Sequence, residues 1–277
     1  MVLLTEVLNN MQIFLAIASF VFGNLIGSFL NVVILRLPQE QSLTGRSHCM
    51  HCRHVLQPWE LIPVVSFLLL RGKCSSCGKG ISPRYFIIEL ITGFLFLAGF
   101  LLLQPITPFD IVRLIGWWFV SAIAISVFVI DLEHYIILDV LVLPGAIIAL
   151  CFRLVLDILF HVPVTFFHSL AVTGILGALL GSLPFFLVWF FSKGKWMGFG
   201  DVKLLLFMGA VLGWHLVGVA ILLAVFAGGL VSSVLLFATD KTLKSQIPFG
   251  TFLSAALLVT LGFGDQILHW YLSLLGI

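Results

Sequence analysis

Six residues of this sequence have the types and spacing that could carry out chemistry: two aspartates and four cysteines. Asp131 lies in a short turn after a long apolar stretch, and Asp201 directly follows Gly198-Phe-Gly200. Two carboxylates that meet at the ends of different helices share one proton, because like charges a few Å apart cannot both ionise. One carboxylate could then activate water while the other protonates a leaving amine. The pair is therefore a candidate for hydrolysis of a peptide bond.

Structural explanations also exist for both aspartates. Asp131 could be a solvated charge in a turn at a membrane surface, where acidic residues are much less costly than at mid-membrane. An ion pair with Lys203 or Lys195 would account for Asp201. The two glycines, Gly198 and Gly200, allow the close approach of an extended peptide backbone or simply form a tight turn. We take Gly198, Gly200 and Lys203 as candidate substrate-binding residues.

Four of the five cysteines form two C-x-x-C pairs, Cys49 with Cys52 and Cys74 with Cys77, separated by 21 residues. This spacing is close to that of tetrahedral zinc sites. Gly78 follows the second pair, where a residue of positive φ lets backbone amides approach the sulfurs. We expect a structural zinc ion held by four thiolates with no open position. Two disulfides or four free thiols are the alternatives, and a reducing cytoplasm disfavours the disulfides.

The elements that must position these residues are membrane helices. The chain is 61% hydrophobic and only 9% charged, with a mean hydropathy of +1.21, whereas soluble domains are about 45 to 50% apolar and about 25% charged. This composition excludes a soluble protein and requires a lipid bilayer around the chain. The net charge of +2 gives no reason to expect nucleic acid as a partner.

Continuous apolar stretches occur at residues 11–35, 86–104, 111–130, 136–156, 169–191, 202–213, 215–238 and 252–275. We therefore expect an all-α polytopic membrane protein with about eight transmembrane or membrane-embedded helices and a zinc-ribbon-like loop. Its expected parts are a first transmembrane helix at 1–35, a zinc-binding loop at 36–85 and a membrane-embedded core at 86–277. The stretch 202–213 would be about 18 Å long, too short to cross a hydrocarbon core of about 30 Å.

Lysine and arginine are distributed unevenly among the connections. Twelve of the 14 lie in three of them: seven in residues 36–84, three in 193–203, and Lys241 with Lys244. Basic residues accumulate in cytoplasmic loops. This pattern predicts that the zinc loop and the aspartates face the cytoplasm and that both termini lie outside.

Three other features concern the helices: one acidic residue and two pairs of glycines. Glu89 would be costly in a helix if unpaired, and could bond an arginine such as Arg84 or serve a ligand pocket. Gly177-x-x-x-Gly181 and Gly228-Gly229 indicate close helix packing.

Together these motifs identify a family resemblance. The sequence resembles the bacterial type 4 prepilin peptidases, among the GxGD aspartic proteases, and the resemblance covers nearly the whole chain. Besides both Cys pairs, the matching segments are Gly27 to Pro38, Trp59 to Pro63, Ile81 to Tyr85, Glu89 to Gly93, Ile130 to Leu132, Gly198 to Lys203 and Pro248 to Gly250. Met50 and Leu138 stand where this family often has proline.

The resemblance implies that the short basic leader of type IV prepilins or type II secretion pseudopilins is cleaved at the cytoplasmic face of the inner membrane. Asp131 and Asp201 match the two catalytic aspartates. The four cysteines match a zinc loop that accompanies methylation of the new N-terminus from S-adenosylmethionine, so residues 36–85 would form the methyltransferase part.

Two other functions remain open from sequence. The first is a peptidase whose zinc loop is only a scaffold. The second is a non-enzymatic transporter or assembly platform that uses its acidic residues for proton coupling. Such a relay would need acidic residues along a path through the membrane, but the stretches at 169–191, 215–238 and 252–275 contain none before Asp265.

Overall fold

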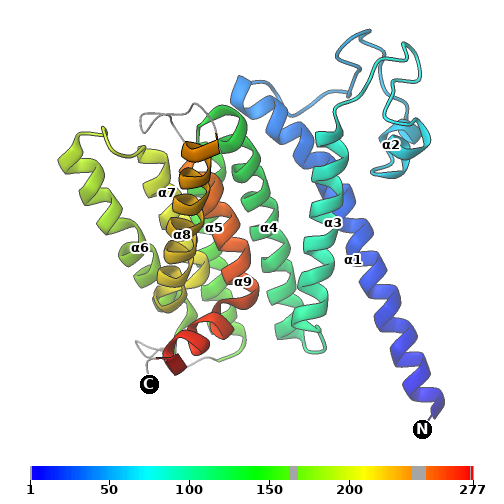
Figure 1. Cartoon of the computed structure of the whole chain (residues 1–277). Coiled ribbons are helices and arrows are strands. Elements are labelled where there is room, and N and C mark those ends of the chain that lie inside the picture. Colours follow the sequence, from blue (N-terminus) through cyan, green and yellow to red (C-terminus); the bar gives the residue numbers. More distant parts are fainter. Residues whose placement is uncertain (1, 162–167, 239–247, 275, 277) are drawn as a thin grey trace. The chain divides into compact units, whose positions relative to one another are not determined.

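The structure is a computed structural model that describes residues 2–161, 168–238, 248–274 and 276; for residues 2–9 and 236–238 it describes the backbone alone. Lys241 and Lys244, which entered the topology prediction, lie outside the described residues. The chain divides into two compact units, residues 1–122 and 123–277. We call them the N-terminal unit and the C-terminal unit and describe each by itself (Figure 1).

The N-terminal unit is built on two long helices, α1 (Val2–Arg36) and α3 (Pro83–Leu103), which pack side by side (Figure 1). Glycines on α1 allow the two helices to approach closely. A Cβ on Gly23 would lie 2.8 Å from the Cα of Gly93, and one on Gly27 would lie 2.7 Å from the Cα of Glu89. Small residues at such crossings let the backbones approach. The crossing fixes the base on which the loop between α1 and α3 is mounted.

That loop contains little regular structure. It holds two short 3₁₀ helices, η1 (Leu37–Gln39) and η2 (Pro58–Leu61), and the short helix α2 (Val65–Leu69). The helix α4 (Pro108–His134) begins in this unit and ends in the next. Near its start, Trp117 and Trp118 donate their indole N–H groups to the carbonyls of Leu95 and Phe96 on α3.

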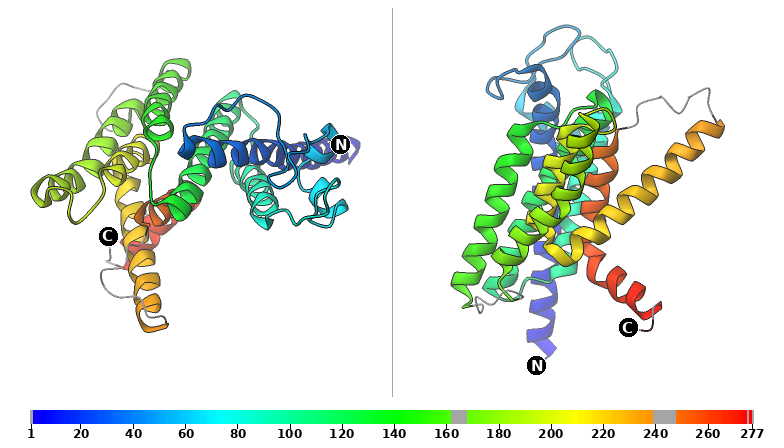
Figure 2. Two further views of the ribbon diagram at one scale, coloured as in Figure 1. Left: turned by 90° about the horizontal axis from the view of Figure 1, so that it is seen from above. Right: turned by 90° about the vertical axis from the view of Figure 1, so that its left-hand side faces the viewer.

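The C-terminal unit contains the end of α4 and five further helices: α5 (Asp139–Leu159), α6 (Leu170–Ser192), α7 (Phe199–Leu212), α8 (Trp214–Ala238) and α9 (Phe249–Leu274). The short helix α7 contacts all four of the others. Its side chains are buried around the whole circumference, including Leu204, Leu205, Phe207 and Met208 at 0% exposure. A helix that is apolar on every side belongs in a core, and α7 is the core of this unit. The C-terminal half of α8 leans outward from it (Figure 2).

Close packing of α6 against α7 and α8 depends on the predicted glycines. A Cβ on Gly177 would lie 2.5 Å from the carbonyl oxygen of Gly209 on α7, and one on Gly181 would lie 2.8 Å from the side chain of Val217 on α8. The packing prediction is confirmed at Gly177 and Gly181. It is wrong at Gly229, beside which a Cβ would meet open space.

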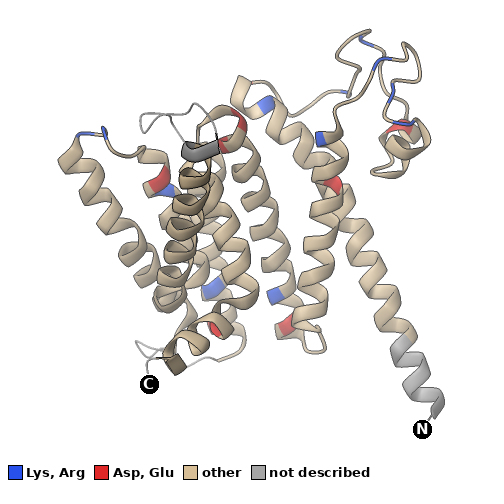
Figure 3. Cartoon of the chain, viewed as in Figure 1, with Lys and Arg blue, Asp and Glu red and all other residues tan. Residues whose placement is uncertain are grey.

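Within the described part of the chain, seven helices are long and apolar enough to cross a membrane: residues 10–39, 83–103, 108–134, 139–159, 170–192, 214–235 and 249–274. The chain is therefore a multi-pass membrane protein, and the expected all-α class is confirmed for the described residues. Helix α7, with 14 residues, is about 21 Å long and is not one of the seven. The predicted shortness of this helix is confirmed, although it begins at Phe199, before the expected Val202. The charged residues of the N-terminal unit lie mostly in the loop between α1 and α3 and near helix ends, and those of the C-terminal unit lie mostly near helix ends (Figure 3).

Candidate functional site

Asp131 lies in the last turns of α4 with its side chain directed at the beginning of α9. The residue is 4% exposed, and its Oδ2 accepts hydrogen bonds from the backbone N–H of Thr251 at 2.6 Å and from the Thr251 hydroxyl at 3.1 Å. Thr251 is in the first turn of α9, where free N–H groups and the helix dipole favour negative charge. These donors and the helix dipole therefore offset part of the cost of burying this carboxylate.

Asp201 lies in the first turn of α7, whose N-cap is Gly198. Its carboxylate accepts from the backbone N–H of Gly198, as in a capping box. Burial and the nearby charge of Asp131 raise the pKa of Asp201 to about 7. The two aspartates therefore interact electrostatically, as predicted for a pair that shares a proton.

One apolar side chain, Ile137, packs against both helix starts. A Cβ on Gly200 would lie 3.0 Å from the Cβ of Ile137, and a Cβ on Gly250 would lie 2.8 Å from its Cδ1. The same Cβ on Gly250 would lie 2.9 Å from Oδ2 of Asp131. Gly200 and Gly250 thus permit the tight packing of α7 and α9 around the pair of aspartates.

The two glycines before Asp201 differ in what surrounds them. At Gly198, where φ is −74°, the nearest atom to an added Cβ is Oδ2 of Asp201 at 3.6 Å, so this position is open on the side that faces the carboxylate. Gly200 is closed by Ile137. The predicted substrate contact is therefore compatible with Gly198, while the role that the structure gives Gly200 is packing.

Lys203 is held by Asp139 at the start of α5. Its Nζ donates to Oδ1 and Oδ2 of Asp139 at 2.7 and 2.6 Å and lies 4.8 Å from the centroid of the Phe199 ring. The structure therefore does not support the alternative in which Lys203 forms an ion pair with Asp201, because the partner of Lys203 is Asp139. A substrate contact by Lys203 stays a prediction.

Sequence reasoning missed two residues of this site, Thr251 and Ile137. The Pro248-Phe-Gly250 segment marked the start of the last helix, and a threonine immediately after it could have suggested a donor at a helix N-terminus. Ile137 carries no such signal, because an isoleucine between two apolar stretches looks like any packing residue.

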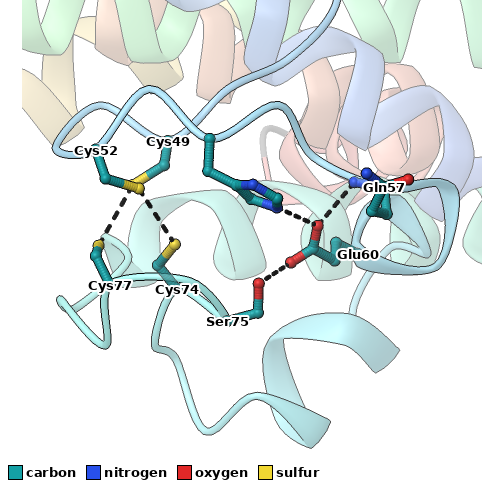
Figure 4. Close-up of polar contacts among 8 residues, drawn as sticks. Cys49, Cys52, Gln57, Glu60, Cys74, Ser75 and Cys77 are labelled. Carbon is teal, nitrogen blue, oxygen red and sulfur yellow. Dashed lines mark hydrogen bonds and ion pairs between the residues drawn. The ribbon is translucent and has the colours of Figure 1, made fainter.

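The four cysteines come together in the N-terminal unit. Their sulfur atoms all lie within 4.8 Å of one another, with Cys49 and Cys77 Sγ 3.9 Å apart and Cys52 and Cys74 Sγ 3.9 Å apart (Figure 4). The cluster could hold a zinc ion, for which four thiolates are a common structural set. The distances between the sulfur atoms fit a shared metal ion better than disulfides, since a disulfide bond is about 2 Å long.

Both cysteine pairs lie in turns of the same geometry. The N–H of Cys49 donates to the carbonyl of His54, and the N–H of Cys74 to that of Lys79. The residue after each pair has positive φ, 58° at Arg53 and 68° at Gly78, which confirms the prediction for Gly78. The N–H groups of Cys52 and His51 lower the pKa of Cys49 to about 6, which favours the thiolate that a metal needs.

Glu60 ties the two cysteine turns together (Figure 4). Its carboxylate accepts from the backbone N–H of Gln57 at 2.7 Å, from the Ser75 hydroxyl beside Cys74, and contacts His54 Nε2 at 3.3 Å. The hydrogen bond from Gln57, and after it the one from Ser75, lowers the pKa of Glu60. Glu60 is 7% exposed, so it is a buried ionised group that organises the loop, and the sequence analysis gave it no role.

Glu89 on α3 holds a strained turn. Its Oε2 accepts from the backbone N–H of Val64 at 2.7 Å, in place of the arginine that one interpretation expected. Val64 has φ 64° and ψ −52°, and Val65 N–H donates to Pro63 O at 2.6 Å. This is a γ-turn with a β-branched residue at its centre, a rare conformation that costs about 1–3 kcal/mol. Such strain is typical of functional sites.

Two protein-family models together match most of the chain. Residues 21–103 match the bacterial peptidase A24 N-terminal domain, and residues 118–233 match the type IV leader peptidase family. The first match contains the four cysteines and Glu89, and the second contains Asp131 and Asp201. The resemblance inferred from the motifs is confirmed.

Curated relatives match over nearly their whole length. A protein of Stutzerimonas stutzeri is 34% identical with 97% of each chain covered, one of Aeromonas hydrophila is 33% identical with 92% covered, and one of Pseudomonas aeruginosa is 33% identical with 94% covered. Each of the three is named prepilin leader peptidase/N-methyltransferase. No solved structure matches the chain.

Proposed function

Because the chain belongs to the type IV leader peptidase family, we propose that it cleaves the leader of prepilins or pseudopilins and then methylates the new N-terminus. The observation that carries the cleavage proposal is the pair of carboxylates in the C-terminal unit, Asp131 buried and Asp201 half-buried, which interact although they lie 70 positions apart in the chain. A transporter would need charged groups along a path, whereas these two gather at helix ends.

The hydrogen bonds support a different proposed role for each aspartate. Thr251 places two donors on Asp131, so in a pair that holds one proton the proton resides on Asp201. Asp131 takes a proton from water, whose oxygen adds to the scissile carbonyl carbon. Asp201 gives its proton to the departing nitrogen as the C–N bond breaks. Two groups in these roles are sufficient for general acid–base hydrolysis.

Substrate approach is supported by Gly198. It has no side chain between the surrounding space and Asp201, so an extended peptide backbone could lie close to the acid. We propose that the leader junction binds beside Gly198 and that Lys203, held by Asp139, sets the orientation of the first turn of α7.

Methylation is assigned to the N-terminal unit, with the zinc loop as its folded part. S-adenosylmethionine would supply the methyl group. The amine nitrogen forms a bond to the methyl carbon, the C–S bond breaks with its electron pair left on sulfur, and the amine loses one proton. A zinc ion on the four cysteines would act structurally, because four thiolates leave no open position.

The proposed location is the inner membrane, with the zinc loop and the aspartates on the cytoplasmic side and both termini outside. It rests on the distribution of basic residues. Protease added to spheroplasts should leave the loop intact and remove a C-terminal tag. Digestion of the loop with protection of the tag would reverse the topology.

The product mass tests the whole proposal. Purified protein is incubated with a prepilin that carries a short basic leader, with and without S-adenosylmethionine. We expect loss of the leader in both samples and an added methyl group only with the methyl donor. Cleavage without methylation would reduce the function to a peptidase, and an unchanged precursor would reject the proposal.

A further inference from the structure

A cavity of about 800 Å³ lies within the N-terminal unit, away from any residue assigned to cleavage. Its wall is formed by α1, α3 and the loop between them, and includes Asn31, Glu60, Phe67, Phe86 and Glu89. Cavities for small molecules usually have volumes of about 300–1,000 Å³. This one is therefore large enough for a nucleoside-sized ligand.

One buried polar atom in this wall has no hydrogen-bond partner among the described residues. Asn31 is 4% exposed, and its Nδ2 donates to the carbonyl of Tyr85 at 3.1 Å. Its Oδ1 is buried and accepts no hydrogen bond from the described residues. Leaving such an acceptor unsatisfied costs about 1–3 kcal/mol. A ligand with an N–H or O–H group in the cavity would satisfy it.

The wall also carries two buried carboxylates. Glu60 is occupied by its three donors and shapes the loop, whereas the described contacts of Glu89 are neutral: the N–H of Val64 and the hydroxyl of Ser28. Negative groups at low exposure favour a cation and repel phosphate. The ligand should therefore be cationic and free of phosphate groups.

An aromatic pair completes the wall. Phe67 from the loop and Phe86 from α3 stack with ring centroids 5.2 Å apart and 26° between their planes. Both border the cavity, so they offer a flat apolar surface of the kind on which a purine ring packs.

On these grounds we propose that the cavity binds S-adenosylmethionine, with Glu89 facing its positively charged part and Asn31 Oδ1 accepting from its adenine amino group or a ribose hydroxyl. This molecule has a sulfonium and an ammonium group, a purine and no phosphate. The inference rests on the proposed methylation and names its donor site. Val64 belongs to the same arrangement, because its strained turn aims an N–H at Glu89.

The cavity also connects the ligand to the zinc loop. Cys49, Cys74 and Ser75 border it, and Ser75 donates to Glu60. Loss of the metal should therefore open one wall of the cavity and weaken binding of the donor.

Binding by the purified full-length protein tests the proposal directly. Isothermal titration with S-adenosylmethionine would be performed on the unaltered chain, Asn31→Ala, Glu89→Gln and the control Asn24→Ala. Asn24 is also a buried α1 asparagine that donates to a backbone carbonyl and has an unpaired Oδ1, but it does not border the cavity. We expect Kd to rise about 10- to 100-fold for Asn31→Ala and Glu89→Gln and to change less than about threefold for Asn24→Ala.

A second ligand isolates the role of charge. 5′-Methylthioadenosine lacks the sulfonium and amino-acid groups, so Glu89→Gln should weaken it much less than it weakens S-adenosylmethionine, while Asn31→Ala should weaken both. Equal losses for the two ligands in Glu89→Gln would overturn the role of Glu89. Metal content measured for each variant shows that the loop has folded, and a Glu89→Asp variant is used if Glu89→Gln does not fold.

The outcomes separate the site from the function. If Asn31→Ala and Glu89→Gln bind the donor like the unaltered chain while pilin is still methylated, the cavity assignment is overturned and the proposed function stands. If the unaltered chain neither binds S-adenosylmethionine nor methylates pilin, both are overturned.

Discussion

The two units position their chemistry in different ways. In the N-terminal unit the candidate site sits on a loop with little regular structure, held by four cysteines and by Glu60. In the C-terminal unit the aspartates sit on helix ends around the buried helix α7. We expect the first arrangement to depend on a metal, because a short polar loop has little core of its own. The second depends on helix packing, so the two sites should fail under different perturbations.

The largest effect is expected from Asp131→Asn. Asparagine keeps the size of the side chain but cannot accept a proton from water, so prepilin cleavage should fall by about 10²–10⁴-fold or more. Cleavage by purified variants is measured on a denaturing gel, with Glu133→Gln as the control on the same helix. Equal losses in the two variants would point to a folding defect.

Replacement of one cysteine should perturb only the first unit. In Cys77→Ser the metal loses a ligand, and the zinc content should fall from about one per chain to well below half. The loop should become sensitive to protease at the same time. Cys151→Ser, in a membrane helix, is the matched control. Unaltered metal content in Cys77→Ser, or little zinc in the unaltered chain, would rule out the zinc site.

The pH dependence of cleavage tests the protonation of Asp201. Its pKa is raised to about 7 by burial and by Asp131, so the carboxyl is protonated below that pH and loses its proton above it. The rate of cleavage should fall by roughly tenfold per pH unit above about pH 7 to 8. A rate that stays constant up to about pH 9 would contradict the role of Asp201 as the acid.

Gly250→Ala should reduce cleavage while leaving the fold intact. The added methyl would lie 2.9 Å from Asp131 Oδ2 and 2.8 Å from Ile137, so Thr251 and the carboxylate must shift. We expect a loss of about 10- to 100-fold, since small displacements at such sites have effects of this size. Gly229→Ala, where the methyl meets open space, should change the rate little.

The smallest effect is expected from Lys203→Met. The side chain of Asp139 is 55% exposed and that of Lys203 is 22% exposed, so solvent screens the pair and its contribution to stability is about 0.2–1 kcal/mol. Thermal unfolding and the KM for prepilin would both be measured. We expect both to change little; a large rise in KM with unchanged stability would contradict this expectation and would indicate that Lys203 contacts the substrate.

The sequence predicted what depends on composition and spacing. Apolar stretches identify the helices, the shortness of α7 follows from counting residues, and the cysteine pairs indicate their own cluster. Ile137 could not be predicted, and for Thr251 the sequence indicates only a donor at a helix start, because their contacts with the aspartate pair arise only when α4, α5, α7 and α9 meet in space. The same holds for Glu60 and Val64, whose contacts depend on the path of an irregular loop, and for Lys203, whose partner is 64 positions away.

The central claim is that cleavage and methylation belong to different units. Its most direct test uses Asp201→Asn with two substrates: the full prepilin, and a pilin peptide supplied without its leader together with S-adenosylmethionine. The product masses are measured for both. We predict that the precursor stays uncleaved while the shortened peptide gains a methyl group at close to the normal rate. Cleavage of the precursor at close to the normal rate, or loss of methylation in a stably inserted variant, would contradict the account.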